Sequence, residues 1–119
     1  MDRHQIRDYL LAKPETIEDF PFGIEVAVFK VKHKMFATLS AQDGIANMNL
    51  KCDPAEALAL RDIFASVKPG YHMNKKHWNT IILDGGVPDN EIKRMIDNSF
   101  LLVVQGMPKK DRTSIEIQL

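Results

Sequence analysis

A chain of 119 residues is long enough for one hydrophobic core and too short for two, so we expect a single domain over residues 1–119. With 45% apolar and 27% charged residues, the composition is typical of a globular protein and not of an intrinsically disordered one. Lysine and arginine number 16, as do aspartate and glutamate, so the net charge is zero and any nucleic-acid partner must be held by a local basic patch.

The cysteine content and the hydropathy of the sequence indicate the cellular setting of the protein. The single cysteine, Cys52, cannot form an internal disulfide, and a buried structural role is commoner for such a residue than a nucleophilic one. No apolar run approaches the roughly 20 residues of a membrane span, and the start of the chain does not resemble a signal peptide. These features predict a reducing, cytoplasmic setting.

The first predicted element is a helix that begins after Asp2. Asp2 and Gln5 have the spacing of a capping box, and apolar residues follow at helical intervals. Pro14 disfavours the helical conformation of the residue before it, so we expect the helix to end at Lys13.

Three strands are expected next, over residues 24–31, 35–40 and 45–51. Lys32-His33-Lys34 separates the first two strands as a hairpin turn, and Gln42-Asp43-Gly44 separates the second from the third. Because strands joined by hairpins are antiparallel, these elements predict an antiparallel sheet.

A second helix is expected from Asp53, where Asp53-Pro54-Ala55-Glu56 provides a cap, a proline at the first helical position and an early acid. Its predicted buried face consists of Ala55, Leu58, Ala59 and Ile63. A further strand is expected over residues 78–83.

A third helix is expected to begin at Pro88 and to end at Gly106, and Pro108 is expected to prevent it from resuming. The resulting order predicts an α+β fold in which helices cover one face of the antiparallel sheet. The apolar positions expected to share its core are Phe29, Phe36, Leu50, Ile81, Ile92, Ile96 and Phe100.

Residues 70–80 form the most unusual segment of the chain. They include two histidines, two lysines, a tyrosine and the only tryptophan, and they contain no acid. Cationic side chains beside aromatic rings suit an anionic partner that carries rings, such as a nucleic acid. Alternatively, the segment is a solvated loop in which Trp78 is a largely buried anchor whose indole N–H bonds a polar neighbour. We expect Trp78 to be mostly buried.

Basic residues gather at the predicted hairpin tip and in the 70–80 segment. Lysines at these positions could follow a phosphate backbone, but lysines on hairpin tips also prevent unwanted pairing between sheet edges. The candidate nucleic-acid-binding residues are Lys30, Lys32, His33, Lys34, His72, Asn74, Lys75, Lys76, His77 and Trp78.

Motifs for catalysis and metal binding are not found in the sequence. The spacing of His72 and His77 suits neither one helical face nor one strand face, and no carboxylate lies between them. We therefore expect no metal, no cofactor and no enzymatic activity. A less favoured alternative is a small-ligand binder or enzyme centred on His72, Asn74 and His77.

Several short segments within residues 1–110 form a recognisable set. They are Pro21-Phe22-Gly23, Val28-Phe29-Lys30-Val31, Lys34-Met35-Phe36-Ala37, Asn74-Lys75-Lys76-His77-Trp78-Asn79-Thr80, Leu83-Asp84-Gly85, Pro88-Asp89-Asn90-Glu91-Ile92, Ile96-Asp97-Asn98-Ser99-Phe100 and Val103-Val104 before Pro108-Lys109-Lys110. Together these segments resemble the bacterial MmcQ/YjbR family.

The resemblance implies a two-layer sandwich similar to the CyaY/frataxin fold. It also implies DNA binding through a double-wing motif, whose wings would be β-hairpins such as the one at Lys32-His33-Lys34. The iron binding of frataxins is not implied, because the first helix here lacks their acidic character. The sequence thus predicts weak, sequence-tolerant DNA binding. The alternative is a protein–protein adaptor or regulatory module that uses the same 70–80 segment.

Overall fold

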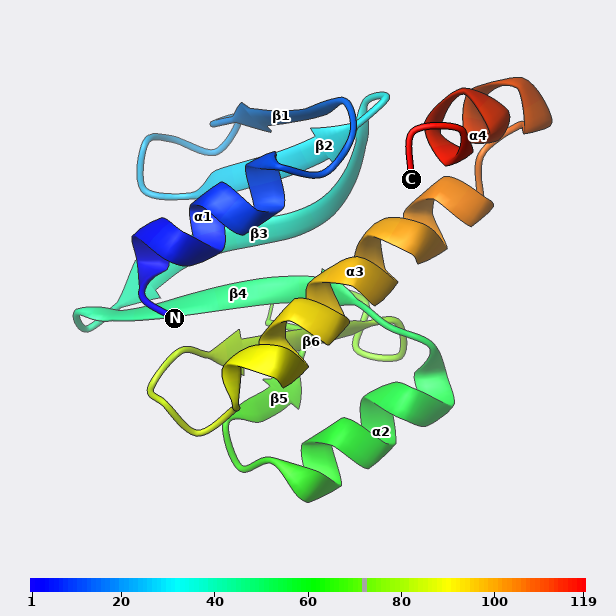
Figure 1. Cartoon of the computed structure of the whole chain (residues 1–119). Helices are drawn as coiled ribbons and strands as arrows, with labels where there is room; N and C mark the ends of the chain where they lie inside the picture. The colour runs from blue at the N-terminus through cyan, green and yellow to red at the C-terminus, as the bar shows by residue number, and fades with distance from the viewer. Residues whose placement is uncertain (72) are drawn as a thin grey trace.

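The computed structural model describes residues 1–71 and 73–119, and these form one six-stranded sheet with helices on one face (Figure 1). The strand order is β1-β2-β3-β4-β6-β5, and every neighbouring pair is antiparallel. The elements are α1 (Arg3–Leu11), β1 (Thr16–Asp19), β2 (Ala27–Val31), β3 (Lys34–Gln42), β4 (Ile45–Lys51), α2 (Pro54–Ile63), β5 (Val67–Pro69), β6 (Trp78–Ile82), α3 (Asp89–Gln105) and α4 (Lys109–Glu116). The predicted α+β class is confirmed.

Local signals determine where most of these elements begin. Asp2 and Gln5 form both hydrogen bonds of a capping box, and the Asp53 side chain accepts hydrogen bonds from the first turn of α2. Lys32 and His33 have φ angles of 46° and 67°, as a two-residue hairpin turn requires. The predicted hairpin between β2 and β3 is therefore confirmed.

The predicted end of α3 at Gly106 is confirmed, but the prediction that Pro108 prevents helical structure from resuming is wrong. Pro108 is the N-cap of α4, which begins at the next residue. At a helix N-terminus a proline loses nothing by lacking an N–H group, because that group would have no helical partner. The sequence also gave no sign of β1 and β5, which are only 4 and 3 residues long.

The predicted buried face of α2 is also wrong. Ala57 and Leu60 are buried, whereas Leu58 and Ile63 are 64% and 67% exposed, and Ala55 and Ala59 are exposed as well. Both sets of residues have helical spacing, so periodicity alone could not choose between them. α2 packs against the short strand β5 and its neighbour β6, and the narrow Ala57–Leu60 stripe suffices for that contact.

The core lies between the sheet and the helices, and it contains all seven residues predicted for it. Phe36 and Phe100 meet edge to face, with ring centroids 5.2 Å apart. A register shift between β2 and β3 leaves Phe36 as an extra residue, so Phe36 and Ala37 are both buried in the core. Ser99 of α3 donates to the Phe36 carbonyl and accepts from the Lys51 backbone, which joins α3 to β3 and β4.

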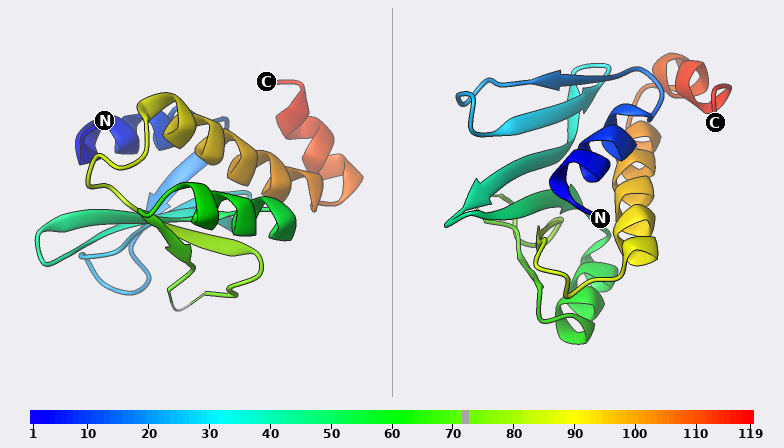
Figure 2. Two further views of the ribbon diagram at one scale, coloured as in Figure 1. Left: turned by 90° about the horizontal axis from the view of Figure 1, so that it is seen from below. Right: turned by 60° about the vertical axis from the view of Figure 1, so that its left-hand side comes forward.

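The opposite face of the sheet has no helix over it. Seen from below, the helices lie on one side of the sheet, and two loops, residues 20–26 and the described part of residues 70–77, project from the other side (Figure 2, left). We call this side the open face. No helix in the described part of the chain is both long and apolar enough to span a membrane.

Candidate functional site

Short polar side chains form the middle of the open face. Thr38 and Ser40 of β3 lie opposite Asn49 and Asn47 of β4, and Asn49 in turn lies opposite Thr80 of β6. Since side chains two residues apart on a strand share a face, these five residues form one continuous polar floor.

A chain of hydrogen bonds across this floor has a fixed donor-to-acceptor order. The backbone N–H of Tyr71 donates to Thr80 Oγ1 over 2.9 Å, so the Thr80 hydroxyl donates onward to Asn49 Oδ1. Asn49 Nδ2 then donates to Thr38 Oγ1 over 3.0 Å. A backbone amide can only donate, so the start of the chain orients every later member.

A cleft between the two loops has four of the five floor residues at its base, namely Thr38, Ser40, Asn47 and Asn49. The cleft has a volume of about 590 Å³, and its walls carry apolar and aromatic side chains. Gly23 adopts a φ of 107°, which a side chain rarely allows, and this turn positions the neighbouring Phe22 at the rim. The residues lining the cleft are Phe22, Glu25, Val26, Met35, Thr38, Ser40, Ala41, Gln42, Asn47, Asn49, Tyr71 and Met73.

Arg61 of α2 holds the base of the 70–77 loop. Its guanidinium donates to Asn79 Oδ1 over 2.7 Å, and it also donates to the carbonyls of Lys75 and Trp78. The Gly70 N–H donates to the Trp78 carbonyl, which closes the loop. Sequence reasoning missed Arg61 because its partners are 14–18 residues away in a segment with no acid to suggest a cation partner.

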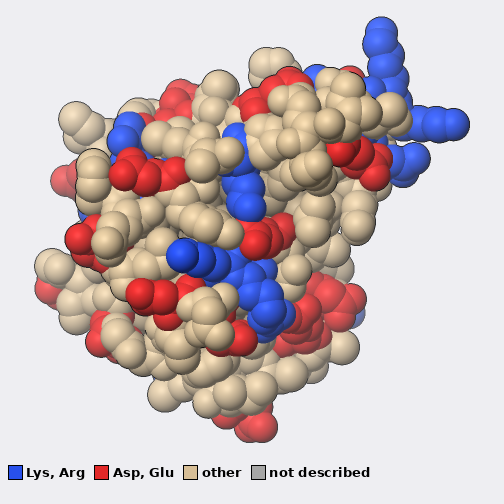
Figure 3. All heavy atoms as spheres, viewed as in Figure 1, with Lys and Arg blue, Asp and Glu red and all other residues tan. Residues whose placement is uncertain are grey.

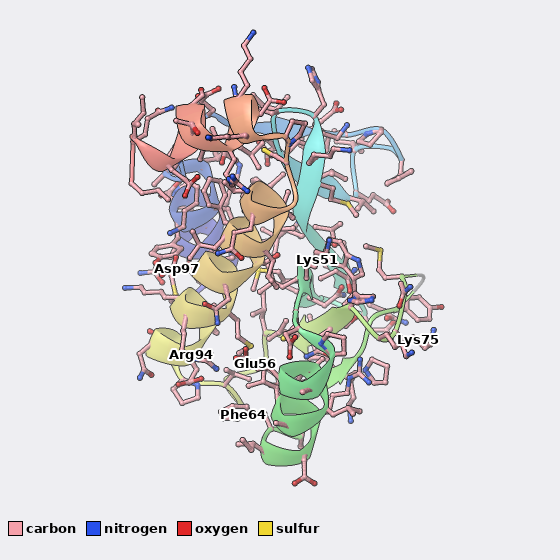
Figure 4. The ribbon with its side chains drawn as sticks, turned by 90° about the vertical axis from the view of Figure 1, so that its right-hand side faces the viewer. Lys51, Glu56, Phe64, Lys75, Arg94 and Asp97 are labelled. Atoms are coloured by element: carbon pink, nitrogen blue, oxygen red, sulfur yellow. The ribbon has the colours of Figure 1, made fainter. Side chains whose placement is uncertain are left out.

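Within the loop, Asn74 shapes a turn: its side chain accepts from the Lys76 N–H and its carbonyl accepts from the His77 N–H. Lys75 and Lys76 are exposed, and His77 is half-buried. Figure 4 shows the end of the molecule from which Lys75 projects. His72 lies outside the described residues.

Trp78 does not face the core. It shares its strand face with Thr80, on the open side, while Asn79 and Ile81 are buried toward the helices. Trp78 is half-buried, and no hydrogen bond of its indole N–H is found within the described part of the chain. Trp78 is thus less buried than expected, and its side chain lies on the open face and not in the core.

Two of the candidate lysines at the hairpin tip form ion pairs. Lys30 Nζ lies 3.0 Å from Asp19, and Lys32 Nζ lies 3.2 Å from Glu15. The hydrogen bond from Lys30 lowers the pKa of Asp19 below its usual value. Both lysines are 25% exposed, whereas His33 and Lys34 are exposed at the turn.

The hairpin tip and the 70–77 loop lie at the same end of the sheet. β3 begins at Lys34, β4 ends at Lys51 and β6 begins at Trp78, and these strands alternate in direction. Lys51 lies directly opposite Trp78, and Lys68 of β5 lies directly opposite Thr80. Both lysines therefore belong to the open face.

Cys52 has the environment of a buried structural cysteine. Cys52 is 8% exposed, and burial raises the pKa of its thiol to about 11, so the thiol is protonated and weakly nucleophilic at neutral pH. No group of three His, Cys, Asp or Glu side chains that could hold a metal ion is found in residues 1–71 and 73–119.

Several residues that carry the family resemblance have structural partners. Asp84 accepts from Ser66 Oγ over 2.7 Å and from the Gly86 N–H over 3.0 Å, and these bonds lower its pKa. Asp97 accepts from the Tyr9 hydroxyl over 2.8 Å, which joins α3 to α1 (Figure 4). The Leu83-Asp84-Gly85 turn and Asp97 thus stabilise the fold at some distance from the open face.

Comparison with known proteins identifies the family. The sequence model of the YjbR family matches residues 11–102. The chain belongs to the YjbR family. It is 40% identical to the uncharacterized protein YbdF of Escherichia coli O157:H7 over 96 residues, which cover 81% of this chain and 79% of YbdF. It is 31% identical to the uncharacterized protein YjbR of Escherichia coli K12, covering 91% and 92% of the two chains.

Solved structures of similar proteins have the same fold. The DUF419 domain of the Deinococcus radiodurans protein DR2400 superposes with a TM-score of 0.87 at 37% identity, over 95% of this chain and 86% of that chain. A Pseudomonas syringae protein superposes with a TM-score of 0.77 at 32% identity, over 87% and 99% of the chains. The further likeness to CyaY stays a prediction, and the names of these YjbR-family relatives state no activity.

Proposed function

We propose that this YjbR-family protein binds DNA weakly and with little sequence preference, through lysines at the edge of the open face. We call Lys51, Lys68, Lys75 and Lys76 the basic edge. The binding is electrostatic, with lysines on phosphates, and it involves no chemical step. The hairpin tip adds His33 and Lys34, while Lys30 and Lys32 contribute less because each already has a carboxylate partner.

The observation that carries this proposal is a group of four lysines without carboxylate partners beside the open-face cleft. None of the four basic-edge lysines forms an ion pair with a carboxylate among the described residues. The helical side is different, because acidic and basic side chains are interspersed over α1 and α3 (Figure 3). A polyanion would meet carboxylates there, but the basic edge offers it cations together with exposed aromatic surface.

Replacement of Lys75 and Lys76 by alanine tests the proposal. The loss of one lysine–phosphate contact reduces the slope of log K against log salt concentration by about one unit at most. The double variant should therefore flatten this slope by about one to two units. The measurement is a series of fluorescence anisotropy titrations of labelled DNA between low and moderate salt.

The matched control is Lys109→Ala with Lys110→Ala, which removes the same charge from exposed positions at the start of α4. This control should leave the slope close to that of the wild type. Equal losses in both double variants would mean that only net charge matters, and no binding at low salt would remove the proposal. The protein–protein adaptor that uses the 70–77 loop would then become the leading proposal.

A further inference from the structure

We infer that the open-face cleft binds one unpaired keto base, such as thymine, of a single strand whose phosphates lie along the basic edge. This inference deepens the proposed DNA binding and rests on it. It assigns a different task to the cleft than to the lysines: the lysines hold any nucleic-acid backbone, and the cleft selects for a free base with carbonyl oxygens.

The polar floor suits carbonyl oxygens because the Thr38 hydroxyl and the Asn47 amide offer protons that no acceptor takes up among the described residues. In the chain from Tyr71 through Thr80 and Asn49, each oxygen already accepts one hydrogen bond, and the Thr38 hydroxyl proton is left at the end. Ser40 donates to Asn47 Oδ1 over 3.1 Å, which orients the Asn47 amide so that Nδ2 has no protein partner in the described chain. A ligand that meets these N–H and O–H groups must supply acceptors.

The walls of the cleft suit a flat ring. Phe22 is 74% exposed and Tyr71 is 63% exposed at its rim, and Val26, Met35 and Met73 add apolar surface. Glu25 lines the cleft and no lysine or arginine does, so a phosphate group is disfavoured inside and the phosphates remain outside. An aromatic wall strengthens the binding of a base that stacks on it.

Sequence and register place the basic edge directly beside the cleft. Asn49 and Lys51 are two residues apart on β4, and their Cα atoms are therefore about 7 Å apart on the same face. Lys68 lies opposite Thr80, and Lys75 follows Met73 by two residues. A strand that contacts these lysines can thus place a neighbouring base in the cleft. The bases of a duplex are paired and stacked, so a duplex cannot do so without opening.

The experiment compares three single strands of equal length and charge: oligothymidylate, oligoadenylate and an abasic oligonucleotide without bases. Oligothymidylate should bind the wild-type protein at least about fivefold more tightly than the abasic strand, the ratio that corresponds to about 1 kcal/mol. It should also bind more tightly than oligoadenylate, whose exocyclic amine would oppose the Asn47 amide donor.

Two variants test whether the tighter binding of oligothymidylate arises in the cleft. Asn47→Ala removes the free amide donor, and Phe22→Ala removes a wall at an exposed loop position where the fold does not depend on it. Both should reduce oligothymidylate affinity severalfold and leave abasic affinity unchanged. Lys75→Ala with Lys76→Ala should weaken the binding of all three strands alike.

The outcomes separate the two proposals. If the abasic strand binds as tightly as oligothymidylate, the cleft does not take a base, although the proposed DNA binding stands. If oligoadenylate equals oligothymidylate, or if neither cleft variant changes their binding, the assigned selection for carbonyl oxygens is wrong. If no strand binds, both proposals fail together.

Discussion

Replacing Phe100 by alanine is expected to lower the free energy of unfolding by about 3–5 kcal/mol, as truncation of a buried aromatic side chain commonly does. Phe100 is 1% exposed and packs edge to face on Phe36, the extra residue of β3 that is buried in the core. The cavity would open at the contact between α3 and the sheet. Urea denaturation followed by circular dichroism measures the loss.

Phe22→Ala is the matched control for this measurement. It deletes the same group of atoms from a side chain that is 74% exposed on the 20–26 loop, so stability should change by less than about 0.5 kcal/mol. Similar losses for the two variants would mean that the core is not between α3 and the sheet. Because Phe22 also lines the cleft, its variant separates stability from binding.

Replacing Gly70 by alanine is expected to destabilise the protein by about 1–3 kcal/mol, the usual cost of an overpacked site. A Cβ atom at position 70 would lie 2.8 Å from both Cβ and O of Trp78 and 3.1 Å from Cβ of Met73. One of these atoms belongs to the backbone of β6, so the loop base and the strand would have to separate. Thermal or urea denaturation measures the effect.

Gly106→Ala provides the control at a glycine with free space. Its Cβ would meet only carbonyl oxygens at 3.6 and 3.7 Å, and the φ of −81° suits alanine. This variant should be as stable as the wild type or slightly more stable. If Gly70→Ala were equally harmless, the close approach of β5 and β6 beneath the 70–77 loop would be wrong.

The sequence predicts most of the fold because the decisive signals are local. Asp2 and Asp53 cap helices within their own first turns, and the Lys32-His33 turn needs only its two flanking strands. The buried face of α2 was not predictable, because two apolar stripes fit the same helix and only tertiary packing selects Ala57 and Leu60.

The candidate site was less predictable because its features depend on partners far along the chain. Lys30 and Lys32 pair with residues on or beside β1, a short strand without a clear sequence signal. Alternation in β6 shows that Trp78 and Thr80 share a face, but it does not show which face the helices cover. Asn47 and Asn49 do alternate with apolar residues in the sequence, and this uncharged polar pattern was the available sign of the cleft floor.

The most direct test of the central claim is a titration of ¹⁵N-labelled protein with oligothymidylate at low salt, followed by amide chemical shifts. The account predicts progressive shifts at Thr38, Asn47, Asn49, Thr80 and the basic edge, and none along the exposed side of α3. Shifts confined to the helices would contradict the claim that the open face binds DNA, as would a spectrum that does not change.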